Sequence, residues 1–126
     1  MKKILLVEDD PVSAMVLEDF LGANGYSVTR AKNGVEGVER FEKDRPDLML
    51  VDVMLPRKNG FEVCFEVKRT EHGRNTPVLL MSAFYRDEDH GAKYAHEGLR
   101  ADAYMVKPFD MQQMLARIRE LLAEAA

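Results

Sequence analysis

The stretch Ile4-Leu5-Leu6-Val7-Glu8-Asp9-Asp10, residues 4–10, joins four apolar residues directly to three carboxylates. Three later apolar runs also end at a polar residue: residues 48–51 lead into Asp52, residues 78–81 into Ser82, and residues 104–106 into Lys107. Short continuous apolar runs are typical of strands buried on both faces, as in a parallel sheet covered by helices. Because open sheets bind ligands at the carboxyl ends of their strands, we expect these polar groups to meet at one sheet edge.

Helical patterns alternate with the strand-like runs. We expect strands near residues 3–7, 26–30, 47–51, 77–81 and 102–106, and helices near residues 11–23, 34–44, 60–70, 87–97 and 110–124. The turn residues agree, since Asp10-Pro11 is a favoured N-cap and first helical residue, and Asn59-Gly60 is a turn before the third helix. Strict alternation predicts an α/β fold, a doubly wound five-stranded parallel sheet with helices on both faces.

The second strand differs from the others in its pattern. Residues 26–30 alternate polar and apolar side chains, which is typical of an edge strand, whereas the runs at 4–7, 48–51 and 78–81 suit the middle of a sheet. The strand order 2-1-3-4-5 would place the ends of the first and third strands side by side. The predicted architecture is therefore a flavodoxin-like three-layer sandwich.

Length and composition narrow the class of protein. The chain has 126 residues, which suits one domain over residues 1–126, and we expect no output domain within it. The net charge of -4 argues against a primary binder of nucleic acid or of anionic membranes. Cys64 is the one cysteine, so no disulfide can form within the chain, and the four apolar residues before Glu8 are too few for a signal peptide or a membrane span. These features predict a cytoplasmic protein.

Carboxylates gathered at one edge repel one another, so we expect a cation among them. Oxygen ligands favour a hard ion, for which Mg²⁺ is the natural candidate. Asp10 precedes Pro11 and is expected to cap a helix instead of binding metal. Glu8 and Asp9 have no such structural role. Asp52 ends a buried run, where an unpaired carboxylate is costly, so it needs a partner such as the metal or a lysine.

Ser82 and Lys107 complete the set of polar groups at the predicted edge. The Ser82 hydroxyl, at the end of the neighbouring strand, can donate a hydrogen bond to a phosphoryl oxygen. Lys107 precedes Pro108, and an X-Pro bond at a strand end can be cis and direct the lysine side chain. Each signal is weak alone, and their combination at successive strand ends is specific.

Five segments of the chain match the motifs of one known family. They are ILLVEDDP at residues 4–11, PDLMLVDVMLP at 46–56, NG at 59–60, PVLLMSA at 77–83 and KPF at 107–109. Through these segments the chain resembles a bacterial response-regulator receiver domain of the chemotaxis-regulator kind, over essentially its whole length. Chemotaxis members of this family have the 2-1-3-4-5 strand order, so the predicted order follows from the family as much as from the strands.

The resemblance implies a role for each acidic residue. Asp52 would be the phosphoacceptor, and Asp9 a direct ligand of Mg²⁺, with Glu8 as the other half of the acidic pair. Asp52 itself and the backbone carbonyl of Met54 would complete the metal ligands from the protein. Each of these assignments is an expectation carried over from the family onto the matching positions.

The resemblance also implies the response to phosphorylation. Ser82 and Lys107 would contact the phosphoryl group on Asp52, and Tyr104 would swing inward as Ser82 moves. The face formed by the fourth helix, the fifth strand and the fifth helix would then change its protein partners. This is a two-state population shift between conformations of one fold.

The implied function is that of a phosphoacceptor in a two-component system or phosphorelay. The donor would be a sensor histidine kinase or a histidine phosphotransfer protein, and the output a downstream protein effector, with no direct nucleic-acid or membrane partner. The chain would not be an enzyme, although it would assist its own phosphorylation and slow dephosphorylation. A phosphorylation-dependent homodimer is compatible with this function.

The alternative that we keep open is a receiver fold that binds partners without being phosphorylated. The segment 84–100 is longer than usual for the family and carries an unusual aromatic pair, Phe84-Tyr85. Because this segment belongs to the expected output face, its departure from the family pattern keeps the alternative open. A haloacid-dehalogenase-type phosphatase would need a second aspartate two residues after the first, where Met54 stands. A dinucleotide binder would need a glycine-rich turn where residues 8–11 read EDDP.

Two groups of side chains are expected to be solvated and without a chemical role. The three histidines, His72, His90 and His96, show no spacing typical of metal ligands or of a catalytic triad with Cys64. The basic residues around Lys68 are mixed with glutamates, which is typical of a solvated helix end.

Overall fold

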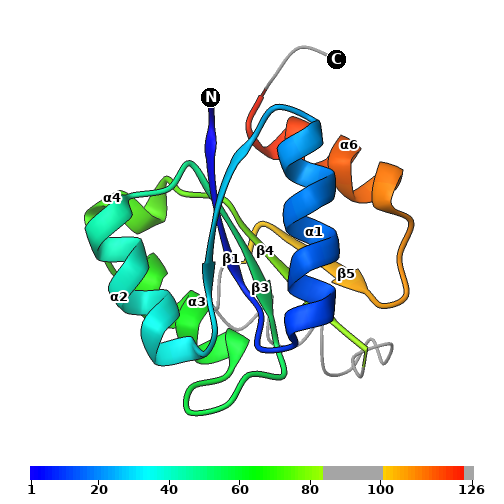
Figure 1. The fold of residues 1–126 in the computed structure, drawn as a ribbon. Coiled ribbons are helices and arrows are strands. Elements are labelled where there is room, and N and C mark those ends of the chain that lie inside the picture. Colours follow the sequence, from blue (N-terminus) through cyan, green and yellow to red (C-terminus); the bar gives the residue numbers. More distant parts are fainter. Residues whose placement is uncertain (84–100, 124–126) are drawn as a thin grey trace.

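The computed structural model describes residues 1–83 and 101–123, which form a five-stranded parallel sheet with helices on both faces (Figure 1). The strands are β1 (Lys3–Val7), β2 (Ser27–Ala31), β3 (Leu48–Asp52), β4 (Val78–Ser82) and β5 (Ala103–Val106). They pair in the order β2-β1-β3-β4-β5. The predicted fold class and strand order are confirmed.

The helices divide between the two faces of the sheet. They are α1 (Pro11–Ala23), α2 (Gly34–Asp44), α3 (Gly60–Lys68), the short α4 (Glu71–Arg74) and α6 (Met111–Leu121). Figure 1 shows α1 and α6 on one face and α2 and α3 on the other. The helix expected at residues 87–97 lies outside the described residues. No helix in the described ranges is long and apolar enough to cross a membrane.

The central strands are apolar throughout because each face of the sheet has its own core. On β1, Ile4 and Leu6 pack in the cluster that contains residues of α1 and α6, whereas Leu5 and Val7 pack in the cluster that contains residues of α2 and α3. All four side chains are at most 1% exposed. Side chains alternate between the faces of a strand, so a strand covered on both faces reads as a continuous apolar run.

The strand β2 is half-buried along most of its length, as expected for an edge strand. It pairs only with β1 among the described strands, in a register that sets Leu6 beside Arg30 and Val7 beside Ala31. The backbone N–H of Glu8 continues this pairing by donating to the Ala31 carbonyl at 3.0 Å. The end of β1 is therefore held against the end of β2.

Several predicted boundaries are wrong by a small margin. Strands β2 to β5 each begin one residue later than expected, so that Asp52 and Ser82 are the last residues of their strands. The helix expected at residues 60–70 ends at Lys68. Thr70 then caps α4, since its hydroxyl accepts from the Gly73 N–H at 2.9 Å and donates to the Val67 carbonyl at 2.7 Å. A threonine side chain that bonds to the local backbone in this way competes with continuation of the helix.

The expectation that Lys68 belongs to a solvated helix end is wrong. Its side chain is 6% exposed, and its ammonium donates to the Thr76 carbonyl at 2.6 Å and to Asp102 Oδ2 at 2.8 Å. The same Asp102 oxygen accepts from the Val78 N–H at 2.8 Å. This bridge joins the end of α3 to the beginning of β4 and to the residue before β5.

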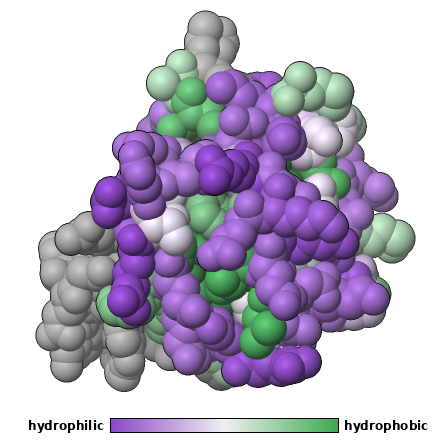
Figure 2. Space-filling view, turned by 90° about the vertical axis from the view of Figure 1, so that its left-hand side faces the viewer, coloured by the Kyte–Doolittle hydropathy of each residue, from purple (hydrophilic) through white to green (hydrophobic). Residues whose placement is uncertain are grey.

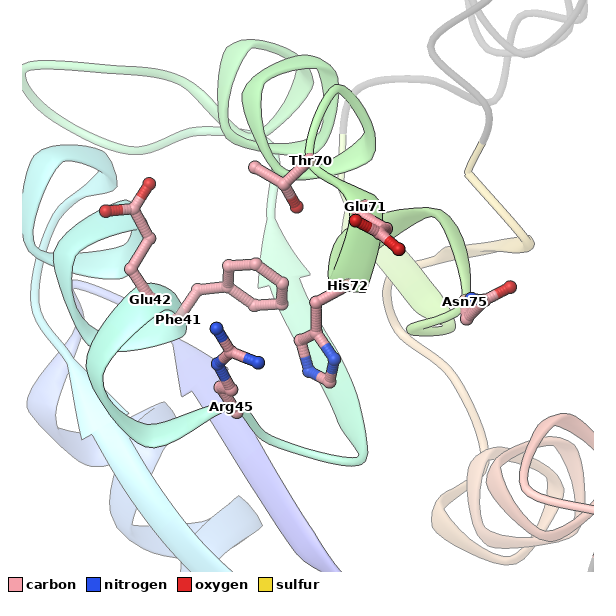
Figure 3. A pocket seen from close by; sticks show the side chains of 7 residues that line it. All are labelled: Phe41, Glu42, Arg45, Thr70, Glu71, His72 and Asn75. Atoms are coloured by element: carbon pink, nitrogen blue, oxygen red, sulfur yellow. The ribbon is translucent and has the colours of Figure 1, made fainter.

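His72 lies at the surface as expected, but it is less solvated than the sequence indicated. His72 is partly buried, and its ring lies 5.4 Å from the Phe41 ring, centroid to centroid. Figure 3 shows both rings, with Arg45 beside them, in a hollow of about 700 Å³ between the end of α2 and α4. His90 and His96 fall outside the described residues.

We predict that Lys68→Met lowers the free energy of unfolding by about 2 to 3 kcal/mol, because it leaves the Thr76 carbonyl and the Asp102 carboxylate without their buried donor. The loss is smaller than for a fully buried pair, since Asp102 is 37% exposed. Urea unfolding measures the change. The matched control is Arg117→Met, which removes an exposed partner of Glu120 and should cost less than about 0.5 kcal/mol. Equal losses in the two variants would contradict the assigned role of the bridge.

Candidate functional site

Three carboxylates meet where β1 and β3 end. Glu8 and Asp9 directly follow β1, and Asp52 is the last residue of β3, its neighbour in the sheet. One oxygen from each carboxylate lies within 4.8 Å of those of the other two. Glu8 and Asp52 are buried, whereas Asp9 is exposed. The predicted meeting of these residues at one sheet edge is therefore found in the structure.

Lys107 supplies the positive charge among them. Its ammonium lies 3.1 Å from Asp52 Oδ2 and 3.2 Å from Glu8 Oε1. Burial alone would lower the pKa of Lys107, but the attraction of the Asp52 and Glu8 carboxylates outweighs burial and raises this pKa. Lys107 is therefore held in its charged form between two carboxylates from different strands.

Glu8 shows how crowded with negative charge the site is. Burial, then repulsion from Asp52 and a hydrogen bond with Asp52, raise the pKa of Glu8 to about 7, although Lys107 acts in the opposite direction. Lys107 contacts two of the three carboxylates, Glu8 and Asp52, and three ionised carboxylates carry more negative charge than this one ammonium balances. A divalent cation would balance this excess.

The ligand atoms at this edge fit a hard cation. All three side chains offer carboxylate oxygens, the ligands that Mg²⁺ prefers, and none offers sulfur or nitrogen. Among the residues that the structure describes, this is the one group of three or more metal-ligating side chains close enough to share an ion. The residues that were expected to hold the metal through side chains are thus suitably placed to do so.

Asp10 does not belong to this group. Its side chain accepts from the Ser13 N–H at 3.0 Å and from the Ser13 hydroxyl at 2.6 Å, as an N-cap of α1 does. These hydrogen bonds, that of the Ser13 hydroxyl first, lower the pKa of Asp10. The prediction of a helix cap is confirmed.

The backbone after β3 fixes one oxygen of Asp52. The Met54 N–H donates to Asp52 Oδ1 at 3.1 Å, while Lys107 takes Oδ2. The Gly60 N–H, at the start of α3, donates to the Val53 carbonyl at 2.9 Å. The metal-binding role expected of the Met54 carbonyl stays a prediction.

Gly60 allows α3 to start unusually close to the predicted acceptor. A Cβ atom at this position would lie 2.4 Å from the Asp52 carbonyl oxygen and 2.7 Å from the Val53 Cα. Both neighbours are backbone atoms and cannot move aside as a flexible side chain would. The Asn59-Gly60 turn is therefore part of what sets the position of Asp52.

Ser82 and Tyr104 lie on the strands next to β3. Ser82 is the buried last residue of β4, and its carbonyl accepts from the Lys107 N–H at 2.9 Å, which ties the ends of β4 and β5 together. Tyr104 is partly buried on β5, packed against the core on the α3 side. The Lys107–Pro108 bond is cis, as the sequence indicated that it can be. The roles expected of Ser82 and Tyr104 stay predictions.

Arg30 is a residue of the site that sequence reasoning missed. Its guanidinium donates from Nε to the Glu8 carbonyl and from Nη2 to the Asp9 carbonyl, both at 3.0 Å. An arginine in a half-polar edge strand is indistinguishable by pattern from a solvated one. The one available signal was its place near the end of the strand predicted to neighbour the Glu8-Asp9 pair.

An apolar groove begins directly beside the charged group. It has a volume of about 580 Å³, shares Glu8 and Lys107 with the site, and is walled by apolar side chains that include Val12, Val16 and Phe109. Val12 and Val16 are 63% and 50% exposed, and Met15 on the same helix is 57% exposed. By contrast, Figure 2 shows the face on the α2 and α3 side as mostly hydrophilic, with small separate hydrophobic patches. We call the exposed residues Val12, Met15 and Val16 the α1 patch.

Comparison with known proteins points to one family. The family model described as the response regulator receiver domain matches residues 4–119. The chain is 38% identical over 122 residues to the "DNA-binding dual master transcriptional regulator RpaA" of Synechocystis sp., covering 97% of this chain and 49% of RpaA. It is 42% identical over 120 residues to the response regulator MprA of Mycobacterium leprae, covering 95% of this chain and 50% of MprA. The chain thus spans about half the length of these relatives.

A solved structure with the same fold belongs to a receiver domain. The receiver domain of the sensor histidine kinase PA1611 from Pseudomonas aeruginosa is 29% identical and superposes with a TM-score of 0.87 over 98% of each chain. That protein was solved with a magnesium ion coordinated in its active site cleft.

We predict that Gly60→Ala lowers the free energy of unfolding by about 2 kcal/mol or more, because the new methyl group must displace backbone next to Asp52. The matched control is Gly22→Ala on α1, where an added Cβ meets nothing within 4 Å. That control should raise stability by up to about 1 kcal/mol, since alanine favours a helix. Urea unfolding of both variants measures the difference, and a harmless Gly60→Ala would refute the close approach.

Proposed function

The chain belongs to the response regulator receiver domain family, the phosphoacceptor module of two-component signalling, and we propose that Asp52 is its phosphoacceptor. The donor is a phosphohistidine on a sensor kinase or a histidine phosphotransfer protein. The observation that carries the assignment is the position of Asp52, buried, at the end of a central strand and 3.1 Å from the Lys107 ammonium. Asp9 is more exposed and belongs to the metal side of the site, and Glu8 is the more deeply buried of the acidic pair.

In the proposed reaction a carboxylate oxygen of Asp52 attacks the phosphorus of the donor's phosphohistidine. A P–O bond forms and the P–N bond breaks, and the donor imidazole nitrogen leaves with the electron pair of that bond. The leaving imidazole takes up a proton from water if its ring is not already protonated. The product is an aspartyl phosphate, a covalent intermediate known from other phosphotransfer proteins. Lys107, held charged by its neighbours, offsets the negative charge of the transferring group.

We propose that Glu8, Asp9, Asp52 and the Met54 carbonyl hold Mg²⁺ at this edge. The support is the all-oxygen ligand set and the excess negative charge of the three side chains. When bound, the ion would neutralise charge on the phosphoryl oxygens. Lys107 and the backbone N–H of Met54 already hold the two Asp52 oxygens in defined directions.

Phosphorylation is proposed to change protein partners through the surface that includes β5 and α6. A phosphoryl group brings about -1.5 to -2 charge to Asp52, and Ser82 and Lys107 are the neighbouring donors expected to respond. Tyr104, between these two on the chain, would change its rotamer. The partner is a protein effector, since a net charge of -4 gives little attraction to nucleic acid. RpaA is described as DNA-binding, but this chain matches only 49% of it.

The α1 patch and its groove are the proposed docking surface of the phosphohistidine donor. Any protein that brings a phosphoryl group to Asp52 must cover the opening around Glu8 and Lys107, and the groove is continuous with that opening. The exposed Val12, Met15 and Val16 would be buried by such a partner. An apolar helical surface on the donor fits this groove best.

We predict that the chain gains one phosphoryl group when incubated with acetyl phosphate and Mg²⁺, as measured by intact-protein mass. Asp52→Asn should abolish the gain because the nucleophilic oxygen is lost, and EDTA should abolish it because the charge of the transferring group is then unbalanced. A gain that persists in Asp52→Asn would contradict the assignment. A protein partner that binds wild type and Asp52→Asn equally would favour the alternative of a phosphorylation-independent module.

We predict that Val16→Asp slows phosphotransfer from a purified histidine kinase that phosphorylates the wild type by about tenfold or more, because it places a charge in an apolar interface. Phosphorylation by acetyl phosphate should be unchanged, since this small donor does not need the α1 patch. The matched control is Phe65→Ser, which alters a 47% exposed hydrophobic residue on α3. Equal effects of the two substitutions on transfer from the kinase would exclude the patch as the docking surface.

A further inference from the structure

Arg30 is the only side chain, among those for which the described structure gives hydrogen bonds, that binds the backbone carbonyls of both Glu8 and Asp9. It comes from β2, 21 and 22 residues further along the chain. Neither its residue type nor its strand pattern marks it as part of the site. Its two hydrogen bonds nevertheless act on the short connection between β1 and α1 that carries two of the three clustered carboxylates.

The connection is held at both ends by other contacts. At its start, the Glu8 N–H donates to the Ala31 carbonyl at 3.0 Å. At its end, Asp10 caps α1 through Ser13, and the Asp10 N–H donates to Glu8 Oε2 at 3.3 Å. Between these anchors the backbone carbonyls of Glu8 and Asp9 both turn toward the guanidinium. Arg30 therefore fixes the Glu8 and Asp9 carbonyls, which these other contacts do not hold.

An arginine is suited to this task in a way that a lysine is not. The guanidinium is planar and donates from two nitrogens in a fixed fork, whereas an ammonium is a compact charge without a fixed pair of directions. Two carbonyls of consecutive residues, each 3.0 Å from a different nitrogen of one group, restrict the peptide between them. The direction of the Asp9 Cα–Cβ bond, from which its carboxylate projects, follows from the orientation of its backbone.

We propose that Arg30 is a positioning residue that holds Glu8 and Asp9 in the geometry needed to bind the divalent cation. This inference rests on the proposed function, because it assumes that these carboxylates are metal ligands. Residues that orient metal ligands from outside the coordination sphere commonly change metal affinity when they are replaced. Arg30 also brings a positive charge near the site, and that charge by itself would weaken binding of a cation. The two contributions have opposite signs and can be separated by substitution.

Arg30→Lys keeps the charge and removes the fork, so it isolates the effect of geometry. We expect it to weaken Mg²⁺ binding by about three- to tenfold, less than is typical of residues that orient metal ligands, because Arg30 is only half-buried and acts through backbone carbonyls. Arg30→Met removes the charge as well and should still weaken binding, although by less. Titration calorimetry with Mg²⁺ alone measures both dissociation constants. Phosphorylation by acetyl phosphate should need correspondingly more Mg²⁺ for half its maximal rate, and the loss should be recovered at saturating Mg²⁺.

The matched control is Arg40→Met, which removes an arginine on α2 whose partner is the partly exposed Asp44. It should leave the Mg²⁺ dissociation constant unchanged. Thermal unfolding in EDTA measures the stability of each variant without bound Mg²⁺, so that a loss of Mg²⁺ affinity can be told from a loss of folding. The Arg30 variants should melt within about 4 °C of wild type. If Arg30→Lys fails to fold, Arg30→Met decides the question alone.

Two results would overturn the inference while the proposed function stands. One is wild-type Mg²⁺ affinity in Arg30→Lys, and the other, which decides if only Arg30→Met folds, is tighter binding in Arg30→Met, because the net effect of Arg30 would then be that of its charge. A wild-type chain that binds no Mg²⁺ and takes no phosphoryl group would overturn the proposed function and this inference together. The arms of the experiment therefore distinguish the two failures.

Discussion

The site depends on one ammonium shared by two buried carboxylates. Lys107 lies 3.2 Å from Glu8 and 3.1 Å from Asp52, side chains that belong to the ends of two different strands. Without Lys107, the buried pair would be two like charges in a poorly solvated place, which is costly. With it, and with Asp9 close by, the edge still carries more negative than positive charge. That excess of negative charge favours binding of a divalent cation. A phosphoryl group on Asp52 could then be contacted by both the cation and Lys107.

The fold supplies this arrangement through strand order and through a few close backbone contacts. The order β2-β1-β3-β4-β5 sets Glu8 beside Asp52 and brings Lys107 across from β5. Gly60 lets α3 begin against the Asp52 backbone, and Arg30 holds the connection after β1. The two cores keep the sheet rigid from both faces, so the strand ends have little freedom to separate. The positions of the three carboxylates and of Lys107 therefore depend on the packing of the two cores along the strands.

Local sequence patterns predicted the parts of the structure that local forces determine. Apolar runs, and the alternating pattern of β2, located the starts of the strands to within a residue, and Asp10 was recognised as a cap because capping involves residues three apart. Lys68, His72 and Arg30 could not be predicted in the same way. Their environments come from contacts with Asp102, Phe41 and the Glu8-Asp9 backbone, which lie 21 or more residues away in the chain. The local sequence around a basic side chain does not show a partner that is distant in the chain, so the side chain is predicted to be solvated.

Locating the phosphoryl group chemically tests directly whether Asp52 is the phosphoacceptor. Borohydride reduces an aspartyl phosphate to homoserine, so the phosphorylated chain can be reduced, digested and read by tandem mass spectrometry. We predict homoserine at position 52 alone, and only after incubation with both Mg²⁺ and the phosphodonor. A product at Asp9, or phosphorylation without reduction at position 52, would contradict the claim that the charges at this sheet edge are arranged around Asp52.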